Sequence, residues 1–286
     1  MDRNLNWKMK GIAFRVMQVL PGRRTLYRLL QRYVTRNSLV TINERLLRLH
    51  RYQVSNYLRG RRGTAVEFGG GRDFITPLLL SHAGAPEILV FDIERLSSPE
   101  QVNNTIRQLR VLVPGDWPEV SDCDADLECK YRIGYRAPGD ARAMGLPDGS
   151  VSFICSTSVL EHIPPADIEL ILKECRRVGA PDAIFSHVID YADHYVYADS
   201  AIPLFNFYRF TESQWRWWNP PAHYQNRMRH GDFVKLFERF GFSTLETRVS
   251  EQPPAALQNV PLAAQFQRYS PQDLLINSAY FVLQSH

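Results

Sequence analysis

Short apolar runs alternate with helical stripes from about residue 63 onward. The runs are rich in Val, Ile, Leu and Phe, which is typical of strands that are buried on both faces. Between the runs, apolar residues recur at steps of three and four, as they do on one side of a helix. Seven strands are predicted in this way, at residues 64–68, 87–92, 131–135, 151–156, 183–189, 242–249 and 274–283. This alternation predicts an α/β fold in which a mostly parallel, seven-stranded sheet carries helices on both faces.

The predicted helices are marked by their stripes and by their ends. Apolar side chains fall at helical spacing over residues 168–178. A later helix is expected to begin at Gly231-Asp232, with Asp232 as its cap, and to end at Gly241. Residues 111–130 contain two prolines and a glycine, so a loop or an insertion is expected there.

Three further helical stripes precede the sheet pattern, at residues 7–20, 26–34 and 41–58. They predict a helical extension over residues 1–60, followed by the main domain over residues 61–286. Residues 1–62 carry 15 Lys and Arg but only two acidic residues, whereas the remainder carries 19 Lys and Arg and 28 acidic residues. Two interpretations fit this basic extension. It packs on the main domain as a cap over its ligand cleft, or its first helix lies on an anionic membrane surface.

Composition narrows the class of protein. With 44% hydrophobic and 22% charged residues in 286, the sequence is that of an ordinary globular protein. Its four cysteines form no C-x-x-C pair, which favours a reducing compartment and a cytoplasmic location, with contact at the inner membrane surface as an option. No apolar run approaches the roughly 20 residues that a membrane span needs.

The most informative stretch is the turn that follows the first predicted strand. The strand ends in Glu67 and Phe68 and opens into Gly69, Gly70 and Gly71. A dinucleotide site needs a third glycine, but Phe74 occupies that position. Glu67 also places a negative charge where a pyrophosphate would lie. A cationic ligand such as S-adenosylmethionine tolerates that charge better than a diphosphate does.

Taken with later motifs, this turn resembles the class I S-adenosylmethionine-dependent methyltransferases, closest to the type 11 methyltransferase domain. The resemblance is carried by the turn at residues 66–71, by Leu146-Pro147-Asp148-Gly149-Ser150 with the strand after it, and by Val159-Leu160-Glu161-His162-Ile163. Residues 177–183 resemble the family only loosely. The resemblance implies a Rossmann-like sheet and S-adenosylmethionine as cofactor.

The same resemblance implies roles for residues at the ends of the strands. The glycine turn passes under the methionine part of the cofactor, Asp92 binds the ribose hydroxyls, and Ile93 packs on the adenine. Asp140 meets the adenine amino group. The implied cofactor-binding residues are Glu67, Gly69, Gly71, Asp92, Ile93, Asp140, Ala141 and Ser156. The alternative for Asp92 is a helix cap, and for Asp140 a turn residue beside a glycine.

Residues 190–230, an aromatic and irregular stretch, are expected to form a lid insertion over the methyl acceptor. Its candidate substrate-binding residues are Tyr195 and Trp218, whose rings offer flat apolar walls, and Arg227, which can anchor an anion. The alternatives are a lid core for the aromatics and a surface salt bridge for Arg227. His194 and His162 are the candidate catalytic residues, because imidazole suits a general base. Each has an alternative structural role.

The sequence motifs also bear on the acceptor. Methyltransferases that act on base amino groups commonly carry N/D-P-P-Y/F after strand four, but this chain has Ser156-Thr157-Ser158 there. This argues against methylation of exocyclic amines on nucleobases, but it does not separate O-, C- and other N-methylation. We expect a small-molecule or glycan acceptor, with O-methylation as the favoured reaction, no metal site and no nucleic-acid partner. Two alternatives stay open: an RNA methyltransferase that uses the basic arm, and a cofactor-binding domain without catalysis.

Overall fold

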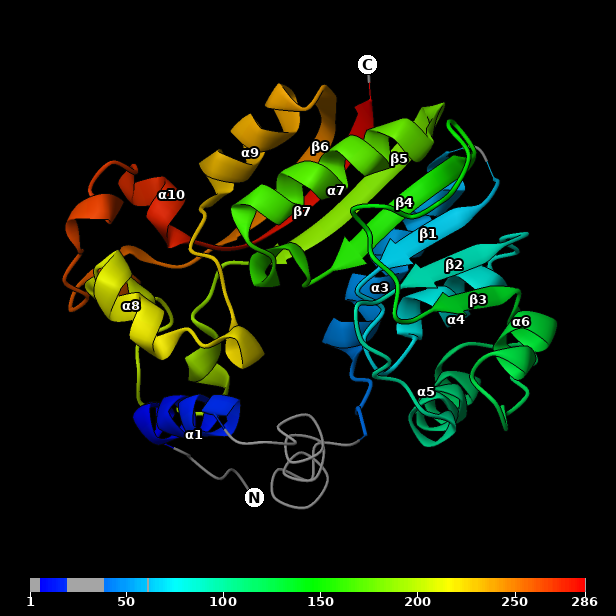
Figure 1. Ribbon diagram of the computed structural model, residues 1–286, viewed down its shortest axis with the longest axis horizontal. Helices are drawn as coiled ribbons and strands as arrows, with labels where there is room; N and C mark the ends of the chain where they lie inside the picture. The colour runs from blue at the N-terminus through cyan, green and yellow to red at the C-terminus, as the bar shows by residue number, and fades with distance from the viewer. Residues whose placement is uncertain (1–5, 20–38, 61, 286) are drawn as a thin grey trace.

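The computed structural model describes residues 6–19, 39–60 and 62–285, and within them seven strands form one sheet (Figure 1). The strand order is β3-β2-β1-β4-β5-β7-β6. Strands β1 to β5 are parallel to their neighbours, whereas β7 is antiparallel to both β5 and β6. The strands are β1 (Ala65–Phe68), β2 (Ile88–Phe91), β3 (Ile133–Arg136), β4 (Val151–Thr157), β5 (Gly179–Asp190), β6 (Phe242–Glu251) and β7 (Ile276–Ser285). The predicted seven-stranded, mostly parallel sheet is confirmed.

Helices cover both faces of this sheet (Figure 1). One face packs against α3, α4 and α5, and the other against α7 and α9. The α-helices are α1 (Trp7–Val19), α3 (Glu44–Arg59), α4 (Ile75–His82), α5 (Pro99–Leu112), α6 (Ala125–Tyr131), α7 (Pro165–Val178), α8 (Glu212–Trp218), α9 (His230–Arg239) and α10 (Pro271–Leu275). Short 3-10 turns are η1 (Leu160–His162), η2 (His194–Tyr197), η3 (Asn206–Arg209), η4 (Pro221–His223), η5 (Pro254–Leu257) and η6 (Ala264–Phe266).

The central strands are apolar because neither face of the sheet meets water there. All four residues of β1 and all four of β2 are buried. The edge strand β6 differs, since most of its residues after Phe242 are partly or fully exposed. The pattern of apolar runs therefore identifies the centre of the sheet better than its edge.

Residues 111–130 contain more structure than the sequence predicts. The expected loop includes the end of α5 and nearly all of α6, in which Leu127 and Tyr131 lie one turn apart and are buried. Tyr131 belongs to this helix, so β3 begins later than predicted. The change of direction occurs at Arg132, which has a left-handed φ of 58°. Because Pro114 and Pro118 lie just upstream, the sequence pattern predicted a loop in place of this short helix.

One helix start differs from expectation. Helix α9 begins at His230, and Asp232 lies in its first turn, where its carboxylate accepts a hydrogen bond from the backbone N–H of Arg229 at 2.9 Å.

Phe74, before α4, has a left-handed φ of 54°, a conformation that costs a bulky residue energy. Its buried ring packs edge-on against Tyr135, with centroids 4.8 Å apart.

A separate aromatic core lies beside the sheet domain (Figure 1). It contains side chains from α1, from residues 190–230 and from residues 252–275, which connect β6 to β7. We call residues 190–230 and 252–275 together the lid, and α1 packs against it. Its buried residues are Trp7, Tyr195, Phe205, Phe207, Tyr208, Trp215, Val260, Phe266 and Leu274. The sequence predicts the aromatic stretch at 190–230 but not the part supplied by residues 252–275.

The described helices of the N-terminal extension pack in two different places. Helix α3 packs on α4 and the sheet, whereas α1 packs on the lid. Gly11 makes the second contact possible, because a Cβ there would lie 2.9 Å from Trp218 Cε3. The stripe at residues 26–34 lies outside the described residues. Among the helices that the structure describes, none is long and apolar enough to cross a membrane.

Candidate active site

The glycine turn after β1 lies at the carboxyl edge of the sheet, and close packing explains its composition. Gly69 and Gly71 have φ values of 73° and 65°, which glycine adopts without steric cost. A Cβ at Gly69 would lie 2.5 Å from Val159 Cγ2, and one at Gly70 would lie 2.3 Å from Val90 Cγ1. Side chains do not fit at either position, so the turn is bare backbone.

Asp92 ties this turn to the end of β2. Its carboxylate accepts hydrogen bonds from the backbone N–H of Gly71 at 3.1 Å and from that of Glu94 at 3.3 Å. Burial raises the pKa of Asp92, and these backbone donors oppose the increase. The next residue, Ile93, is an exposed apolar side chain. An acid held in place beside an exposed apolar surface suits a ligand that has both hydroxyls and a flat ring.

A cavity of about 280 Å³ opens between the ends of β1, β2 and β4. It brings together five predicted cofactor-binding residues with the predicted catalytic His162: Gly69, Asp92, Ile93, Asp140 and Ala141. These residues come from separate loops, so the predicted positions meet in space as the strand order requires.

Arg142 is a lining residue of this cavity that the sequence did not single out. Its guanidinium lies 2.7 Å from a carboxylate oxygen of Asp140 and 2.7 Å from one of Asp167. The Arg142 guanidinium lowers the pKa of Asp140. Both carboxylates are partly exposed. Arg142 lies in a loop and Asp167 in the first turn of α7, so no local sequence pattern predicts their salt bridge.

Glu67, Gly71 and Ser156 do not line the cavity. Glu67 is 3% exposed, and its Oε2 has no hydrogen-bond partner among the described residues. Burial raises the pKa of Glu67 to about 8, with the charge of Asp92 adding to the increase and a hydrogen bond from Thr76 opposing it. The free oxygen lies under the glycine turn, 3.7 Å from where a Cβ of Gly70 would be.

Ser156 is buried inside the sheet. Its Oγ lies 2.8 Å from His187 Nδ1 on the neighbouring β5. Burial lowers the pKa of His187 to about 3, so this imidazole is neutral. The contact links two central strands, and the Ser156 side chain has no access to the cavity as the structure describes it.

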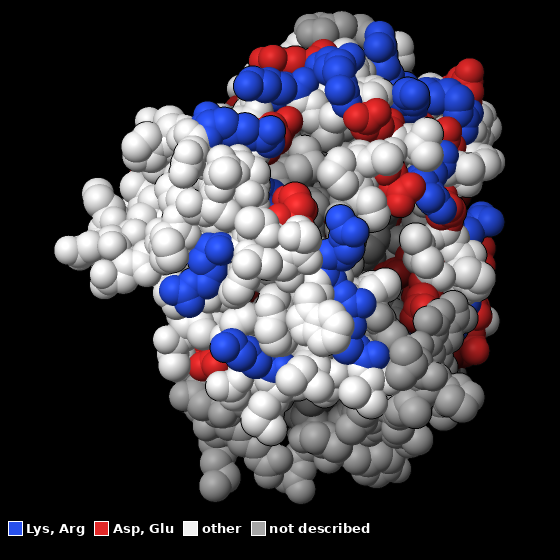
Figure 2. Space-filling view, turned by 60° about the vertical axis from the view of Figure 1, so that its left-hand side comes forward, with Lys and Arg blue, Asp and Glu red and all other residues white. Residues whose placement is uncertain are grey.

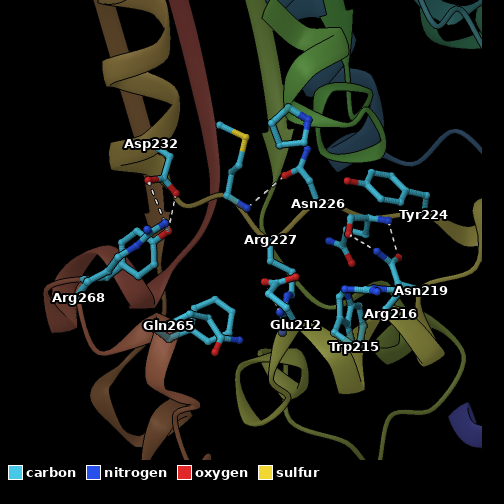
Figure 3. Close-up of a pocket in the computed structure, with 15 residues that line it drawn as sticks. Glu212, Trp215, Arg216, Asn219, Tyr224, Asn226, Arg227, Asp232, Gln265 and Arg268 are labelled. Atoms are coloured by element: carbon cyan, nitrogen blue, oxygen red, sulfur yellow. Dashed lines mark hydrogen bonds and ion pairs between the residues drawn. The ribbon is translucent and has the colours of Figure 1, made fainter.

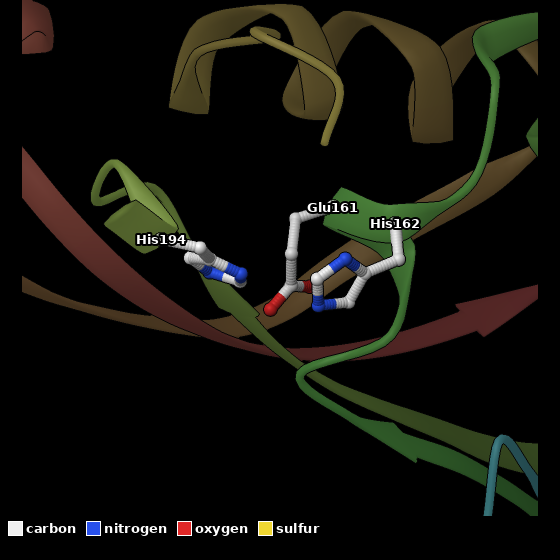
Figure 4. A group of neighbouring side chains, drawn as sticks. All are labelled: Glu161, His162 and His194. Carbon is white, nitrogen blue, oxygen red and sulfur yellow. The ribbon is translucent and has the colours of Figure 1, made fainter. Parts of the chain in front are cut away.

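The two predicted catalytic histidines lie close together. His162 is on η1 after β4, His194 is on η2 after β5, and their ring centroids are 4.7 Å apart. Figure 4 shows the side chain of Glu161 gathered with the two rings. One donor atom from each of these three residues lies within 4.8 Å of the others. The sequence marked Glu161 only as part of a motif.

Two further side chains complete this cluster. Asp190, the last residue of β5, places its Oδ2 3.4 Å from His194 Nε2. The same oxygen accepts a hydrogen bond from the hydroxyl of Tyr197. The arrangement holds an imidazole beside a carboxylate at the carboxyl edge, which is a combination that can remove a proton.

The predicted substrate-binding residues all belong to the lid and have partners there. The Tyr195 hydroxyl donates to the carbonyl of Trp218 at 2.5 Å, and the Trp218 ring packs edge-on against Trp7. Arg227 is buried and donates to the carbonyls of Phe207 and Phe210 at 3.1 and 2.6 Å. An acceptor role for these residues stays a prediction.

A second and larger cavity, of about 560 Å³, lies within the lid side of the molecule (Figure 3). It is lined from α8, from residues 224–228 and from residues 265–269, and it shares no residue with the smaller cavity. Arg227 forms an ion pair there with Glu212, at 2.5 Å. Two of its lining residues nevertheless contact the histidine cluster, since the carbonyl of Tyr224 accepts from His162 Nδ1 and the side chain of Gln225 accepts from the backbone N–H of His194.

One protein-family model matches the chain. A family model described as a methyltransferase domain matches residues 36–247, which is most of the chain. No curated protein matches the sequence.

Solved structures show the same fold at low identity. Geranyl diphosphate methyltransferase in complex with S-adenosylmethionine is 11% identical, over 85% of this chain and 86% of its own, with a TM-score of 0.51. The cyclase SpnF is 13% identical, over 84% of this chain and 81% of its own, with a TM-score of 0.50.

Proposed function

The chain belongs to the methyltransferase domain family and is an S-adenosylmethionine-dependent enzyme, and we propose that it methylates a hydroxyl group of a small molecule or a glycan. The observation that carries this proposal is the cavity at the carboxyl edge, which lies between the glycine turn and the histidine cluster. His162 lines that cavity and also contacts His194, so cofactor and acceptor can meet there.

The cofactor is proposed to lie across the ends of β1, β2 and the loop after β3. Its ribose hydroxyls donate to Asp92, its adenine packs on Ile93, and its adenine amino group meets the region of Asp140 and Ala141. The methionine part lies over Gly69 and Gly71. Glu67 beneath the turn complements the positive charge of the sulfonium and ammonium groups, since an acid in a buried site interacts strongly with a nearby cation.

In the proposed transfer, the bond between the methyl carbon and sulfur breaks while a bond forms between that carbon and the acceptor oxygen. The sulfur retains the electron pair, so the products are S-adenosylhomocysteine and a methyl ether. The acceptor hydroxyl must lose its proton, and His194 beside Asp190 is positioned to receive it, since the carboxylate stabilises the imidazolium. A base at this position is what an acceptor hydroxyl needs.

The lid is proposed to cover the acceptor, with residues 190–230 as its main insertion. Tyr195, Trp218 and Arg227 contribute by holding the lid together, and through it they shape the wall that an acceptor meets. Residues 1–60 are proposed to act partly as cap, through α1 on the lid.

The experiment uses S-adenosylmethionine labelled on its methyl group, with fractionated cell extract. We expect cofactor binding by calorimetry and label in a small-molecule or glycan fraction. Asp92→Ala should weaken binding about 10- to 100-fold, the loss expected for hydrogen bonds to a charged group. Asp182→Ala, which removes an exposed acid on β5, should bind as the unchanged protein does.

Other outcomes of this experiment separate the alternatives. Label in the RNA fraction would identify an RNA methyltransferase and contradict the proposal. Cofactor binding with no label in any fraction would favour a domain without catalysis. Absence of binding in the unchanged protein would reject the cofactor site itself.

A peripheral membrane contact from a cytoplasmic location is proposed as well. Met9, Ile12 and Val16 of α1 are exposed, as is Trp217 of the neighbouring α8. Lys8 and Arg15 lie on the same helix, so apolar and basic side chains occur together. In the lower half of the face in Figure 2, Lys and Arg are scattered over a largely uncharged surface with few acids. Such a surface fits anionic lipid headgroups.

A further inference from the structure

The side chains of Glu161, His162 and His194 form a cluster that resembles a set of metal ligands, which proton transfer alone does not require. It presents one carboxylate oxygen and two imidazole nitrogens within 4.8 Å of one another (Figure 4). The residues are held by two short turns, η1 and η2, at the ends of adjacent strands. Their mutual positions are thus fixed by the parallel pairing of β4 with β5.

One buried ligand atom of the cluster has no partner. Glu161 is 1% exposed, and while its Oε1 accepts from the backbone N–H of Asp190 at 3.3 Å, its Oε2 has no hydrogen bond among the described residues. His194 Nε2 makes no hydrogen bond there either, although the carboxylate of Asp190 lies 3.4 Å from it. An unsatisfied buried polar group is destabilising, so the free oxygen of Glu161 beside two imidazoles points to a bound cation.

The hydrogen bonding of His162 fixes which of its nitrogens is free. Its Nδ1 lies 2.8 Å from the carbonyl oxygen of Tyr224. A carbonyl only accepts, so Nδ1 carries the proton and Nε2 keeps its lone pair. Histidines that bind metals commonly donate their second ring N–H to a backbone carbonyl in this way.

Asp190 adds a second carboxylate to the cluster. Its Oδ2 lies 3.4 Å from His194 Nε2, and its backbone N–H donates to Glu161 Oε1 at 3.3 Å. Carboxylate oxygens and imidazole nitrogens are ligand types that divalent transition-metal ions take.

We propose that Glu161, His162 and His194 bind one divalent transition-metal ion next to the methyl-acceptor site. Two nitrogens and one oxygen suit Zn²⁺, Mn²⁺, Fe²⁺ or Co²⁺ better than Mg²⁺ or Ca²⁺, which prefer oxygen ligands. Three protein ligands leave positions open, as in catalytic metal sites. The sequence predicted no metal here, because the ligands are split between residues 161–162 and 194 and match no metal-binding spacing.

This inference rests on the proposed function, and it refines how the two histidines act. A metal-bound acceptor hydroxyl loses its proton more readily, because the cation stabilises the alkoxide. The histidines would then act as ligands, and Asp190 would receive the proton. Without the metal, His194 acts as the base itself.

The test is a titration of the chelator-treated full chain with Co²⁺, followed by visible absorption, and with Zn²⁺ in competition with a chromophoric chelator. We expect one ion per chain. Glu161→Gln and His194→Ala should each weaken metal binding at least about 10-fold, because loss of even a residue that hydrogen-bonds to a metal ligand commonly lowers the affinity that much. His82→Ala, which removes a histidine stacked on Trp117, should leave metal binding unchanged.

Calorimetry with S-adenosylmethionine on the same variants checks that they are folded and separates the two proposals. Normal cofactor binding with no stoichiometric metal, or with equal metal affinity in His194→Ala, would overturn the metal site and leave the proposed function standing. Loss of cofactor binding in the unchanged protein would reject the function, whatever the metal result.

Discussion

At the scale of single residues, Glu67 is the most informative side chain of the glycine turn. It is buried in the middle of a strand, has an unpaired oxygen, and has a pKa of about 8. A carboxyl group in such a place is neutral near neutral pH unless a cation approaches it. A cationic cofactor over the turn would favour the ionised form, so its binding should release a proton below pH 8.

The raised pKa of Glu67 has a consequence for stability without cofactor. The folded state binds the proton more tightly than the unfolded state, whose pKa is near the ordinary value of 4.5. The stabilisation is therefore complete below about pH 4.5 and is lost as pH rises through 8. Glu67→Gln cannot ionise, so it should gain up to a few kcal/mol relative to the unchanged protein between pH 6 and 9.

Urea unfolding of both proteins across this pH range measures the difference. The comparison cancels the contribution of other buried acids, such as Asp193, whose pKa burial raises to about 6. Parallel curves for the two proteins would show that Glu67 is ionised in the folded state or titrates normally.

At the scale of elements, the contact between α1 and the lid depends on one glycine. Gly11 lies against Trp218 and the hydroxyl of Tyr195, at 2.9 and 3.1 Å from where its Cβ would be. Trp7, one helical turn before it, is buried among Tyr195, Phe210 and Trp218. The basic helix is thereby fixed to the lid through Trp7 and Gly11, whereas Met9, Ile12 and Val16 are exposed.

Gly11→Leu should release α1 from the lid, because the added side chain meets the Trp218 ring. We expect faster hydrogen exchange and proteolysis in residues 7–19, with little change in the sheet. Ala13→Leu adds the same bulk at an exposed position of the same helix and should be tolerated. Equal protection in both variants would show that α1 is not held by this contact.

At the scale of the whole molecule, the features that a local sequence pattern determines are the ones that the sequence predicts best. The strands are apolar because the parallel sheet is buried. The resemblance to the methyltransferase family identified Asp92 and Asp140, and both line one cavity because the ends of parallel strands meet at one edge. The docking of Trp7 on Tyr195 could not be predicted, since it joins residues far apart without a periodic signal. Glu161 looked like a motif residue, and only its missing partner in three dimensions shows it as a candidate ligand.

The exposed apolar and basic residues of α1 lead to a separate prediction about membrane binding. The unchanged protein should sediment with vesicles that contain anionic lipid, less so at high salt because charge attraction is screened, and weakly with neutral vesicles. Ile12→Glu with Val16→Glu should reduce sedimentation several-fold, since both residues are exposed on α1. Binding of this double variant equal to that of the unchanged protein would place the contact elsewhere, or show that it does not exist.

The strand order has a consequence for how the chain folds during synthesis. Strand β6 is made before β7, yet β7 lies between it and β5. A nascent β6 therefore has no place in the sheet until β7 has left the ribosome and paired with β5. The sequence of β6 suits this delay, because its Ser, Thr, Glu and Arg side chains remain largely exposed even after docking. A strand that must wait in water is protected from aggregation by the same polar residues that later form the edge of the sheet.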